Sequence, residues 1–350
     1  MPSPTSPPAA PELVDRAQTS VQSGASVDQT PTSIDPEGPP LALVMGASRG
    51  LGLLIAHELV GRGHPVVISS RTPADLESAR TQILQVHRGA QVEIRPCDVS
   101  DREAVTHLVE EVESTLGPIE VLITVAGVIQ VGPAEAMTFE HFDEAVGIML
   151  QGPINVTLPV LERMRSRGRG RIGTVTSVGG EVTPPHLWPY AVAKKGAVAF
   201  SEGLAAELSG TGITATTVVP GLMRTGSHER AQFTGQPGKE YAWFGPAASL
   251  PLLSMNAQRA AAAIVDGVLA GRVRVELTPL TRVATRFRGL MPGVTTHLMG
   301  VTSRLLPSAS GPGETIEGRA AKQRLGSTAS RVVGALTVLG SRAARRNNER

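Results

Sequence analysis

Short apolar segments alternate with segments of helical periodicity from Leu41 to Leu277 of this 350-residue chain. The apolar segments, which we expect to be strands, are 41–45, 65–71, 91–99, 119–127, 171–177, 213–219 and 272–277. The expected helices are 51–63, 74–89, 101–117, 138–165, 187–209 and 256–270. Strands that alternate with helices are joined by right-handed crossovers, which produce a parallel sheet with helices on both faces. The pattern therefore predicts an α/β fold.

Composition changes at both ends of this alternating region. Residues 1–40 contain 9 of the 27 prolines and show no apolar period, so we expect them to be disordered. Residues 280–350 contain 12 Arg or Lys and 3 Glu, a net charge of +9, whereas the remainder of the chain has a net charge of −7. We therefore expect one α/β domain over 41–279, followed by a basic helical extension over 280–350.

The composition excludes several protein classes. The single cysteine, Cys97, excludes a disulfide framework and a cysteine zinc site, and no His, Asp or Glu grouping has metal-ligand spacing. No apolar run approaches the roughly 18 residues that a membrane span needs, and the N-terminus lacks the features of a secretory signal. Because the excess basic charge lies in the extension rather than on a folded face with aromatics, nucleic acid is not the expected partner. We expect a cytoplasmic protein without a metal.

A glycine-rich turn follows the first expected strand and precedes the first expected helix. It has G-x-x-x-G-x-G spacing, Gly46-Ala47-Ser48-Arg49-Gly50-Leu51-Gly52. Glycines let a backbone approach a pyrophosphate closely, and the positive end of the helix dipole favours its negative charge. A turn that binds no ligand is the alternative. The position of the turn between strand and helix favours a dinucleotide site.

The end of the second strand indicates which dinucleotide is bound. An acid there binds the ribose 2′-hydroxyl of NAD, whereas a neutral residue with a nearby arginine accommodates the 2′-phosphate of NADP. The strand ends Ser69-Ser70-Arg71 without an acid, and Arg49 is a second basic candidate. Both arginines could instead be solvated, but together they favour NADP(H). Asp98, after the third strand, is a candidate to accept from the adenine amino group, to cap the next helix, or to do both.

Three polar residues in the second half of the domain have the spacing of a proton-transfer site. Tyr190 and Lys194 are four residues apart and so share one face of a helix, while Ser177 ends a strand 13 residues before Tyr190. A nearby ammonium stabilises a phenolate and lowers the pKa of the tyrosine. The tyrosine can then donate a proton to a carbonyl or take one from an alcohol, and the serine can fix the substrate oxygen. A surface Tyr–Lys pair is the alternative.

These features together resemble the short-chain dehydrogenase/reductase family over about residues 41–277. The resemblance implies a doubly wound (Rossmann) fold with a parallel seven-stranded sheet, and direct hydride transfer between a nicotinamide and a carbonyl or alcohol carbon. It makes Tyr190 the general acid/base, gives Lys194 ribose binding and the tuning of that tyrosine, and gives Ser177 the polarisation of the carbonyl. The implied cofactor-binding residues are Gly46, Ser48, Arg49, Gly50, Leu51, Gly52, Ser70, Arg71, Asp98, Val99, Ala126, Gly127, Tyr190, Lys194, Pro220, Gly221 and Thr225. We also expect a homo-oligomer.

Two departures from the family pattern concern the site. The usual Asn-Asn-Ala-Gly after the fourth strand is Thr124-Val125-Ala126-Gly127. Met149 stands where the family has an asparagine that supports a water beside the lysine. A thioether donates no hydrogen bond and accepts weakly, so Gln151 or a backbone carbonyl holds the water, or proton supply is impaired. The leading hypothesis is an NADP(H)-dependent carbonyl reductase or alcohol dehydrogenase, and the second is a non-catalytic NADP-binding interaction protein.

The segment 222–255 is expected to cover the substrate. It contains four of the ten aromatic residues of the chain, Phe233, Tyr241, Trp243 and Phe244. Such a lid suits a small hydrophobic carbonyl or alcohol substrate, although these side chains could simply pack the lid onto the core. In the loop before Tyr190, His186 is a candidate for substrate contact.

The basic extension looks like that of a reductase subgroup whose last strand continues into basic amphipathic helices. Arginines interleave with apolar residues over 280–306, a pattern that can lie on an anionic membrane surface or cover an apolar opening on the domain itself. Both roles stay open, and peripheral membrane contact through 280–350 is one of them. Residues 308–326 are expected to form a polar linker, and one last helix is expected from about Ser327.

Overall fold

The computed structural model describes residues 38–251, 254–309, 311 and 313–349. The segment 1–40, which we expected to be disordered, lies almost entirely outside the described residues. Leu252 and Leu253 of the expected lid also lie outside them.

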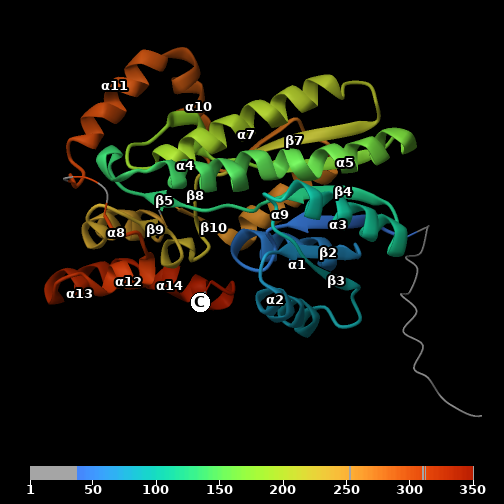
Figure 1. Cartoon of the computed structure of the whole chain (residues 1–350), viewed down its shortest axis with the longest axis horizontal. Helices are drawn as coiled ribbons and strands as arrows, with labels where there is room; N and C mark the ends of the chain where they lie inside the picture. Colours follow the sequence, from blue (N-terminus) through green and yellow to red (C-terminus); the bar gives the residue numbers. More distant parts are fainter. Residues whose placement is uncertain (1–37, 252–253, 310, 312, 350) are drawn as a thin grey trace, which may run out of the picture. The chain divides into compact units, whose positions relative to one another are not determined.

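A parallel seven-stranded sheet forms the centre of the domain (Figure 1). Its strand order is β11-β7-β6-β4-β1-β2-β3, and every neighbouring pair is parallel. The strands are β1 (Leu41–Met45), β2 (Val66–Ser70), β3 (Val92–Pro96), β4 (Ile119–Thr124), β6 (Gly170–Val175), β7 (Ile213–Val219) and β11 (Arg274–Glu276). All seven match predicted strands, which confirms the doubly wound α/β fold. The chain changes direction across the sheet between β1 and β4, where such folds bind ligands.

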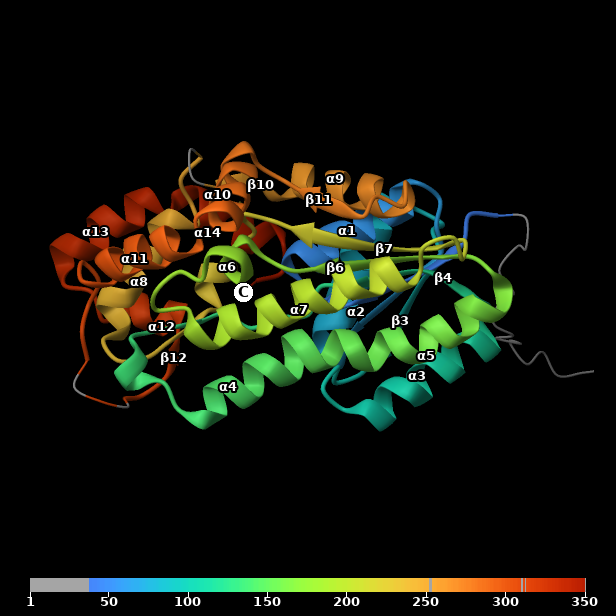
Figure 2. The ribbon, with the colours of Figure 1, turned by 90° about the horizontal axis from the view of Figure 1, so that it is seen from above.

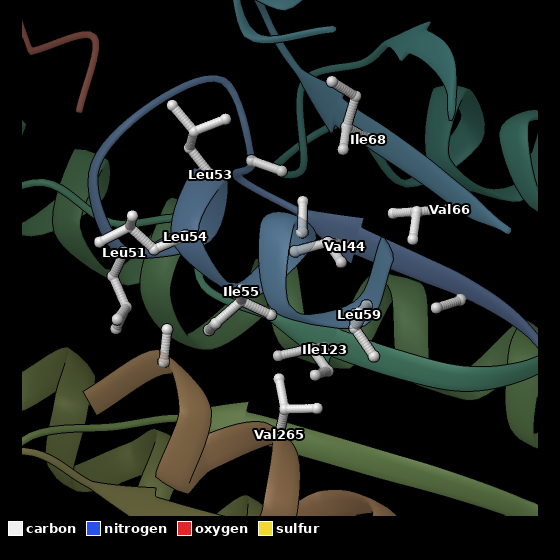
Figure 3. Close-up of a cluster of buried hydrophobic side chains, with 14 of the residues drawn as sticks. Val44, Leu51, Leu53, Leu54, Ile55, Leu59, Val66, Ile68, Ile123 and Val265 are labelled. Atoms are coloured by element: carbon white, nitrogen blue, oxygen red, sulfur yellow. The ribbon is translucent and has the colours of Figure 1, made fainter. Parts of the chain in front are cut away.

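Helices cover both faces of this sheet (Figure 2). One face carries α1 (Gly50–Gly61), α2 (Pro73–Val86) and α9 (Ala257–Leu269). The other carries α3 (Arg102–Thr115), α5 (Gly152–Arg167) and α7 (Trp188–Glu207). Figure 3 shows Ile55 and Leu59 of α1 in one buried cluster with Ile123 of β4 and Val265 of α9. Burial of each such side chain contributes about 1.5–3 kcal/mol, so this packing fixes the start of α1 at the end of β1.

One long helix on the second face is interrupted by a wider turn. It begins as α4 (Phe139–Val146), passes through a π-helical segment, η2 (Gly147–Gln151), and continues as α5. Wider turns of this kind occur frequently at functional sites. The short helix α6 (Val178–Val182) follows β6 directly and leads to α7.

The expected lid and the basic extension fold together into a second, smaller core. The lid comprises β8 (Leu222–Arg224), η3 (Ser227–Glu229), β9 (Gln232–Phe233), α8 (Pro237–Ala247) and β10 (Ser254–Asn256). Preceding them in the chain are β5 (Gln130–Val131) and η1 (Ala134–Ala136), and β9 pairs with both β5 and β12 (Ile316–Glu317). Phe233, Tyr241 and Phe244 are buried with Ala321 and Val333 of the extension. Most lid aromatics therefore pack a core, which was the alternative to a substrate role.

The extension is helical, as predicted, but two of its expected details are wrong. It contains α10 (Pro279–Leu290), α11 (Pro292–Ser303), α12 (Gly318–Gln323), α13 (Ser327–Leu336) and α14 (Val338–Arg346). The expected linker 308–326 includes β12 and α12, because Ala321 is fully buried in the second core. The expected last helix breaks into α13 and α14 at Thr337, whose buried hydroxyl donates to the Val333 carbonyl. Among the described residues, no helix is long and apolar enough to cross a membrane.

Candidate active site

A cavity of about 600 Å³ opens at the carboxyl ends of the central strands, in the ordinary size range of small-molecule sites. Its walls combine the glycine-rich turn after β1, the ends of β2, β4 and β6, the start of α7, and the lid. All of the cofactor-binding residues named from the sequence line this cavity, and so does Ser177. The fold thus brings together residues that lie as far apart in the sequence as Gly46 and Thr225.

The glycine-rich turn is built for close approach of backbone segments. Gly46 has a φ of 89°, and a Cβ there would lie 2.5 Å from the amide nitrogen of Ala126. A Cβ at Gly52 would lie 2.1 Å from the carbonyl oxygen of Gly46. Larger residues at either position would push α1 away from β1 and β4. The turn therefore presents the amino end of α1 to the cavity, where an anion is favoured.

The end of β2 offers unpaired polar groups to the same cavity. Among the described residues, the buried hydroxyls of Ser69 and Ser70 have no hydrogen-bond partner. Arg71 lines the cavity beside them, while a guanidinium nitrogen of Arg49 lies 3.4 Å from a carboxylate oxygen of Asp75. An unpaired hydroxyl next to an arginine fits a phosphate, which accepts hydrogen bonds and carries negative charge.

Asp98 is held at the cavity edge by its own turn. Its Oδ1 accepts hydrogen bonds from the amide (2.9 Å) and the hydroxyl (2.6 Å) of Ser100. Desolvation opposes ionisation, but the bonds from Ser100 and the charge of Arg71 lower the pKa of Asp98 below its usual value. The helix cap that we considered for Asp98 belongs instead to Asp101, which accepts from the amide of Ala104.

Ser177, Tyr190 and Lys194 meet at the inner wall of the cavity. Ser177 caps α6 by accepting a hydrogen bond from the amide of Gly179 (3.0 Å), which fixes its hydroxyl. Tyr190 and Lys194 project from successive turns of α7. Lys194 is buried, and its Nζ donates to the carbonyl oxygen of Val175 (2.8 Å). Desolvation lowers the pKa of Lys194 to about 8.

The expectation that Lys194 lowers the pKa of Tyr190 is wrong for this arrangement. Desolvation raises the pKa of Tyr190, and a side-chain hydrogen bond with Ser177 opposes the increase. Because Lys194 is directed to Val175, its ammonium is not the group that sets the tyrosine pKa here. Tyr190 is therefore protonated at neutral pH, the form that donates a proton.

Met149 is buried in the π-helical segment beside the cavity. Its sulfur would lie 3.4 Å from a Cβ at Gly127. The amide of Gln151 donates to Asn155 (2.9 Å), whose own amide donates to the carbonyl of Val99 (3.1 Å). The side-chain N–H of Gln151 is therefore engaged with Asn155. Gln151, a backbone carbonyl and an impaired proton supply stay the three alternatives at this position.

The comparison with protein families decides how this arrangement is classified. A family model described as short chain dehydrogenase matches residues 40–234. The chain belongs to the short-chain dehydrogenase/reductase family. As a family member it is an oxidoreductase, and the family binds nicotinamide cofactors.

Individual members of the family show the extent of the likeness. A putative ketoacyl reductase of Streptomyces coelicolor is 35% identical over 187 residues, which are 53% of this chain and 71% of that protein. The crystal structure of an actinorhodin polyketide ketoreductase with NADPH has a TM-score of 0.60 and 28% identity, covering 68% of this chain and 95% of its own. A short-chain dehydrogenase from Streptomyces avermitilis has a TM-score of 0.64 and 27% identity, covering 78% and 100%.

His186 lies apart from the other predicted site residues. It does not line the cavity, and its Nδ1 lies 2.9 Å from a carboxylate oxygen of Glu240, which is fully buried. Trp243 donates its indole N–H to the same carboxylate (2.8 Å). His186 thus ties the loop before Tyr190 to α8 of the lid.

A residue that the sequence did not indicate also lines this cavity. Glu349, near the end of the extension, is buried and lines the cavity beside the glycine-rich turn. No periodicity or motif links it to residues 46–52, which precede it by about 300 positions. Only the tertiary structure shows this contact.

Proposed function

We propose that the chain is an NADP(H)-dependent oxidoreductase. It would reduce a small hydrophobic carbonyl compound with NADPH, or oxidise the corresponding alcohol with NADP⁺. The observation that carries this proposal is the meeting of Ser177, Tyr190 and Lys194 on the wall of the same cavity as the glycine-rich turn. Each of the three is held by an interaction of its own, so the arrangement does not depend on mobile surface side chains.

The residues present fit a dinucleotide that carries a 2′-phosphate. Arg71 and the free hydroxyl of Ser70 would hold that phosphate, and Asp98 would accept from the adenine amino group. The glycine-rich turn would hold the pyrophosphate, and Pro220, Gly221 and Thr225 the nicotinamide end. When bound, the nicotinamide supplies a hydride to the carbonyl carbon or takes one from the alcohol carbon. The relative solved with NADPH supports this choice of cofactor.

The protein's own groups handle the substrate oxygen and its proton. Ser177 orients the oxygen through a hydroxyl that α6 holds in place. Tyr190 has a raised pKa and remains protonated at neutral pH, so it donates its proton as that oxygen gains negative charge. Lys194 binds the ribose of the cofactor and adds positive charge near the developing anion.

The cavity wall formed by α6, the start of α7 and α8 carries several apolar side chains. Val182, Leu187, Trp243 and Phe244 line it, from α6, the loop before α7, and α8. Such walls favour a hydrophobic substrate over a sugar, because polar hydroxyls would lose hydration without compensation. The names of two relatives, a ketoacyl reductase and a polyketide ketoreductase, support a ketone as the reacting group.

The decisive experiment is a turnover screen with purified protein. Loss of NADPH absorbance would be followed with aliphatic and aromatic ketones, 3-oxoacyl thioesters and sterol ketones, and repeated with NADH. We expect turnover of at least one apolar ketone with NADPH and much less with NADH. NADPH binding without turnover on any of these classes would instead favour the non-catalytic interaction protein, the hypothesis that Met149 supports.

We also propose that α10 and α11 contact an anionic membrane surface. Leu290, at the end of α10, and Leu305, just after α11, are 84% and 83% exposed, and Arg288 and Arg304 lie near them in the sequence. No Asp or Glu occurs between Glu276 and Glu314. Exposed apolar side chains beside arginines, in a segment without acidic residues, together favour anionic lipid.

Vesicle sedimentation tests the membrane contact. Vesicles containing phosphatidylserine should retain the protein at low salt and release much of it at high salt. Leu290→Glu should weaken retention, whereas Val86→Glu, at another exposed apolar position, on α2, should not. Equal retention of both variants would contradict the assignment to α10 and α11.

A homo-oligomer remains part of the proposal. Leu158 of α5 and Val192 of α7 are exposed apolar side chains. Both helices belong to the layer on one face of the sheet (Figure 2). Light scattering of the parent and a Leu158→Glu variant tests the oligomer. We expect the parent to have the molar mass of an assembly and the variant to have a lower one.

A further inference from the structure

The end of the chain lies across the glycine-rich turn. We call residues 338–349, which contain α14, the C-terminal strap. The carbonyl oxygen of Asn347 accepts a hydrogen bond from the amide of Gly50 (2.7 Å). The side-chain amide of Asn348 donates to the carbonyl of Ser48 (2.8 Å), and its oxygen accepts from the hydroxyl of Ser78 (3.2 Å). Figure 1 shows the C-terminal end of α14 beside α1 and α2.

The strap also reaches the opposite end of the cofactor site. The side-chain amide of Asn347 donates to the carbonyl of Thr225 (2.9 Å). A Cβ at the neighbouring Gly226, whose φ is 103°, would lie 2.3 Å from the Cα of Ala344. The strap therefore bridges the turn proposed for the pyrophosphate and the segment proposed for the nicotinamide end.

Glu349 places a carboxyl group directly against the turn. A Cβ at Gly50 would lie 2.4 Å from Oε1 of Glu349. The main-chain oxygen of Glu349 accepts hydrogen bonds from Arg230 and Arg319. Desolvation raises the pKa of Glu349 to about 7. The negative charge of Glu229 adds to this increase, and the positive charges of Arg49, Arg230 and Arg319 oppose it. A carboxyl group at this point repels a phosphate when ionised and occupies its space in either form.

The amide of Gly50 cannot donate to the strap and to a cofactor phosphate at the same time. It is one of the donors at the amino end of α1 that have no partner within the helix, and such donors are what a bound phosphate uses. Asn347 already occupies it. We propose that the C-terminal strap competes with the dinucleotide for the glycine-rich turn, so that it must leave the turn before the cofactor's phosphates bind. This inference rests on the proposed function, since it concerns the regulation of the same site.

The packing of the strap is consistent with release. Within α14 the buried residues are Gly340 and Ala344, which bury little apolar surface, while Val338 and Leu339 remain about two-fifths exposed. The strap is thus held mainly by a few hydrogen bonds and small-residue contacts. Segments with few buried apolar contacts open at a small fraction of the global unfolding free energy.

Titration calorimetry on the full chain tests the competition. The probes are NADPH and 2′-phospho-ADP-ribose, which carries the phosphates but no nicotinamide. In a double variant, Asn348→Ala with Glu349→Ala, the strap loses its side-chain contacts to the turn, and we expect both probes to bind about tenfold more tightly. Arg345→Ala, at an exposed position of the same helix, is the matched control and should bind like the parent.

Hydrogen exchange provides a readout that does not depend on turnover. Saturating NADPH should decrease the protection of amides in residues 338–349 in the parent, while protection of α1 increases. Equal or weaker binding of the probes by the double variant would overturn the proposal, because the strap would then not compete with the cofactor. Increased protection of the strap with NADPH would also overturn it, because the strap would then close over the bound cofactor. Either result would leave the proposed function standing, whereas failure of every form to bind either probe would remove the proposed function and this inference together.

Discussion

The ammonium of Lys194 donates a hydrogen bond to the main-chain carbonyl of Val175, two residues before Ser177 in the chain. This bond joins α7, which carries Tyr190, to the end of β6, which leads into Ser177. It fixes the relative position of the two hydroxyls that we assign to the substrate oxygen. The lysine therefore positions the site as well as contributing its charge.

The charge of Lys194 should limit the pH range of the enzyme. Burial lowers its pKa to about 8, so the protonated fraction falls as pH rises through that value. In the free enzyme we expect kcat/KM for ketone reduction to be constant below pH about 8 and to decrease about tenfold per pH unit above it. Lys195→Met, at the exposed neighbouring position, should leave this profile unchanged. A profile that stays flat well above this range would contradict the role of Lys194.

Arg71 should determine the preference for NADPH. It lies beside the unpaired hydroxyl of Ser70, where a 2′-phosphate fits. Arg71→Ala should reduce the ratio of NADPH to NADH affinity at least about tenfold, because a charge-assisted hydrogen bond is lost. Arg88→Ala, at an exposed position after α2, serves as the control in the same calorimetric titration. An unchanged ratio in Arg71→Ala would show that the phosphate is not bound here.

Met149 provides a test of proton supply. Its thioether replaces a hydrogen-bonding side chain at a buried position next to Gly127. Met149→Asn should keep or raise kcat for reduction, since an amide can hold a water that a thioether cannot. Met149→Leu, which changes shape little and adds no polar group, should behave like the parent. A decrease in kcat for Met149→Asn with unchanged melting temperature would point to a proton path built around the methionine.

The contact between His186 and Glu240 should stabilise the lid. Glu240 is fully buried and accepts from Trp243, with His186 at 2.9 Å. Glu240→Ala should cost about 3 kcal/mol, because the buried His186 and the half-buried indole N–H of Trp243 lose their partner. The melting temperature should fall by several degrees, and less in Glu240→Gln, whose amide oxygen still accepts. Lys239→Ala, at the exposed neighbouring position, should not change it.

The sheet and the cofactor turn could be predicted because their signals are local. Strands such as 41–45 and 213–219 are apolar runs bounded by turns, and the glycine spacing after β1 follows from the close approach of Gly52 to the carbonyl oxygen of Gly46. Tyr190 and Lys194 share a helical face through a simple four-residue spacing. The predictions depend on contacts within one βα unit.

The parts that were not predicted depend on distant contacts. Asn348 bonds to Ser48, 300 positions away, through a side-chain amide and a main-chain carbonyl, and neither group leaves a pattern in the sequence. The core between α8 and α12 similarly depends on Ala321, together with the partly buried Ile316 and Leu325, and these few apolar residues form no helical or strand period in the sequence. The pKa of Tyr190 was predicted with the wrong sign because the sequence shows neither the desolvation of its hydroxyl nor that Lys194 turns to Val175.

The most direct test of the central claim is the turnover of Tyr190→Phe. The hydroxyl is assigned to proton donation, and the phenyl ring keeps the packing of α7. We expect kcat for reduction of a responsive ketone to fall about 10²–10⁴-fold, while the Kd for NADPH measured by calorimetry stays close to that of the parent. A kcat within about threefold of the parent, with NADPH still bound, would contradict the assignment of Tyr190 as the proton donor.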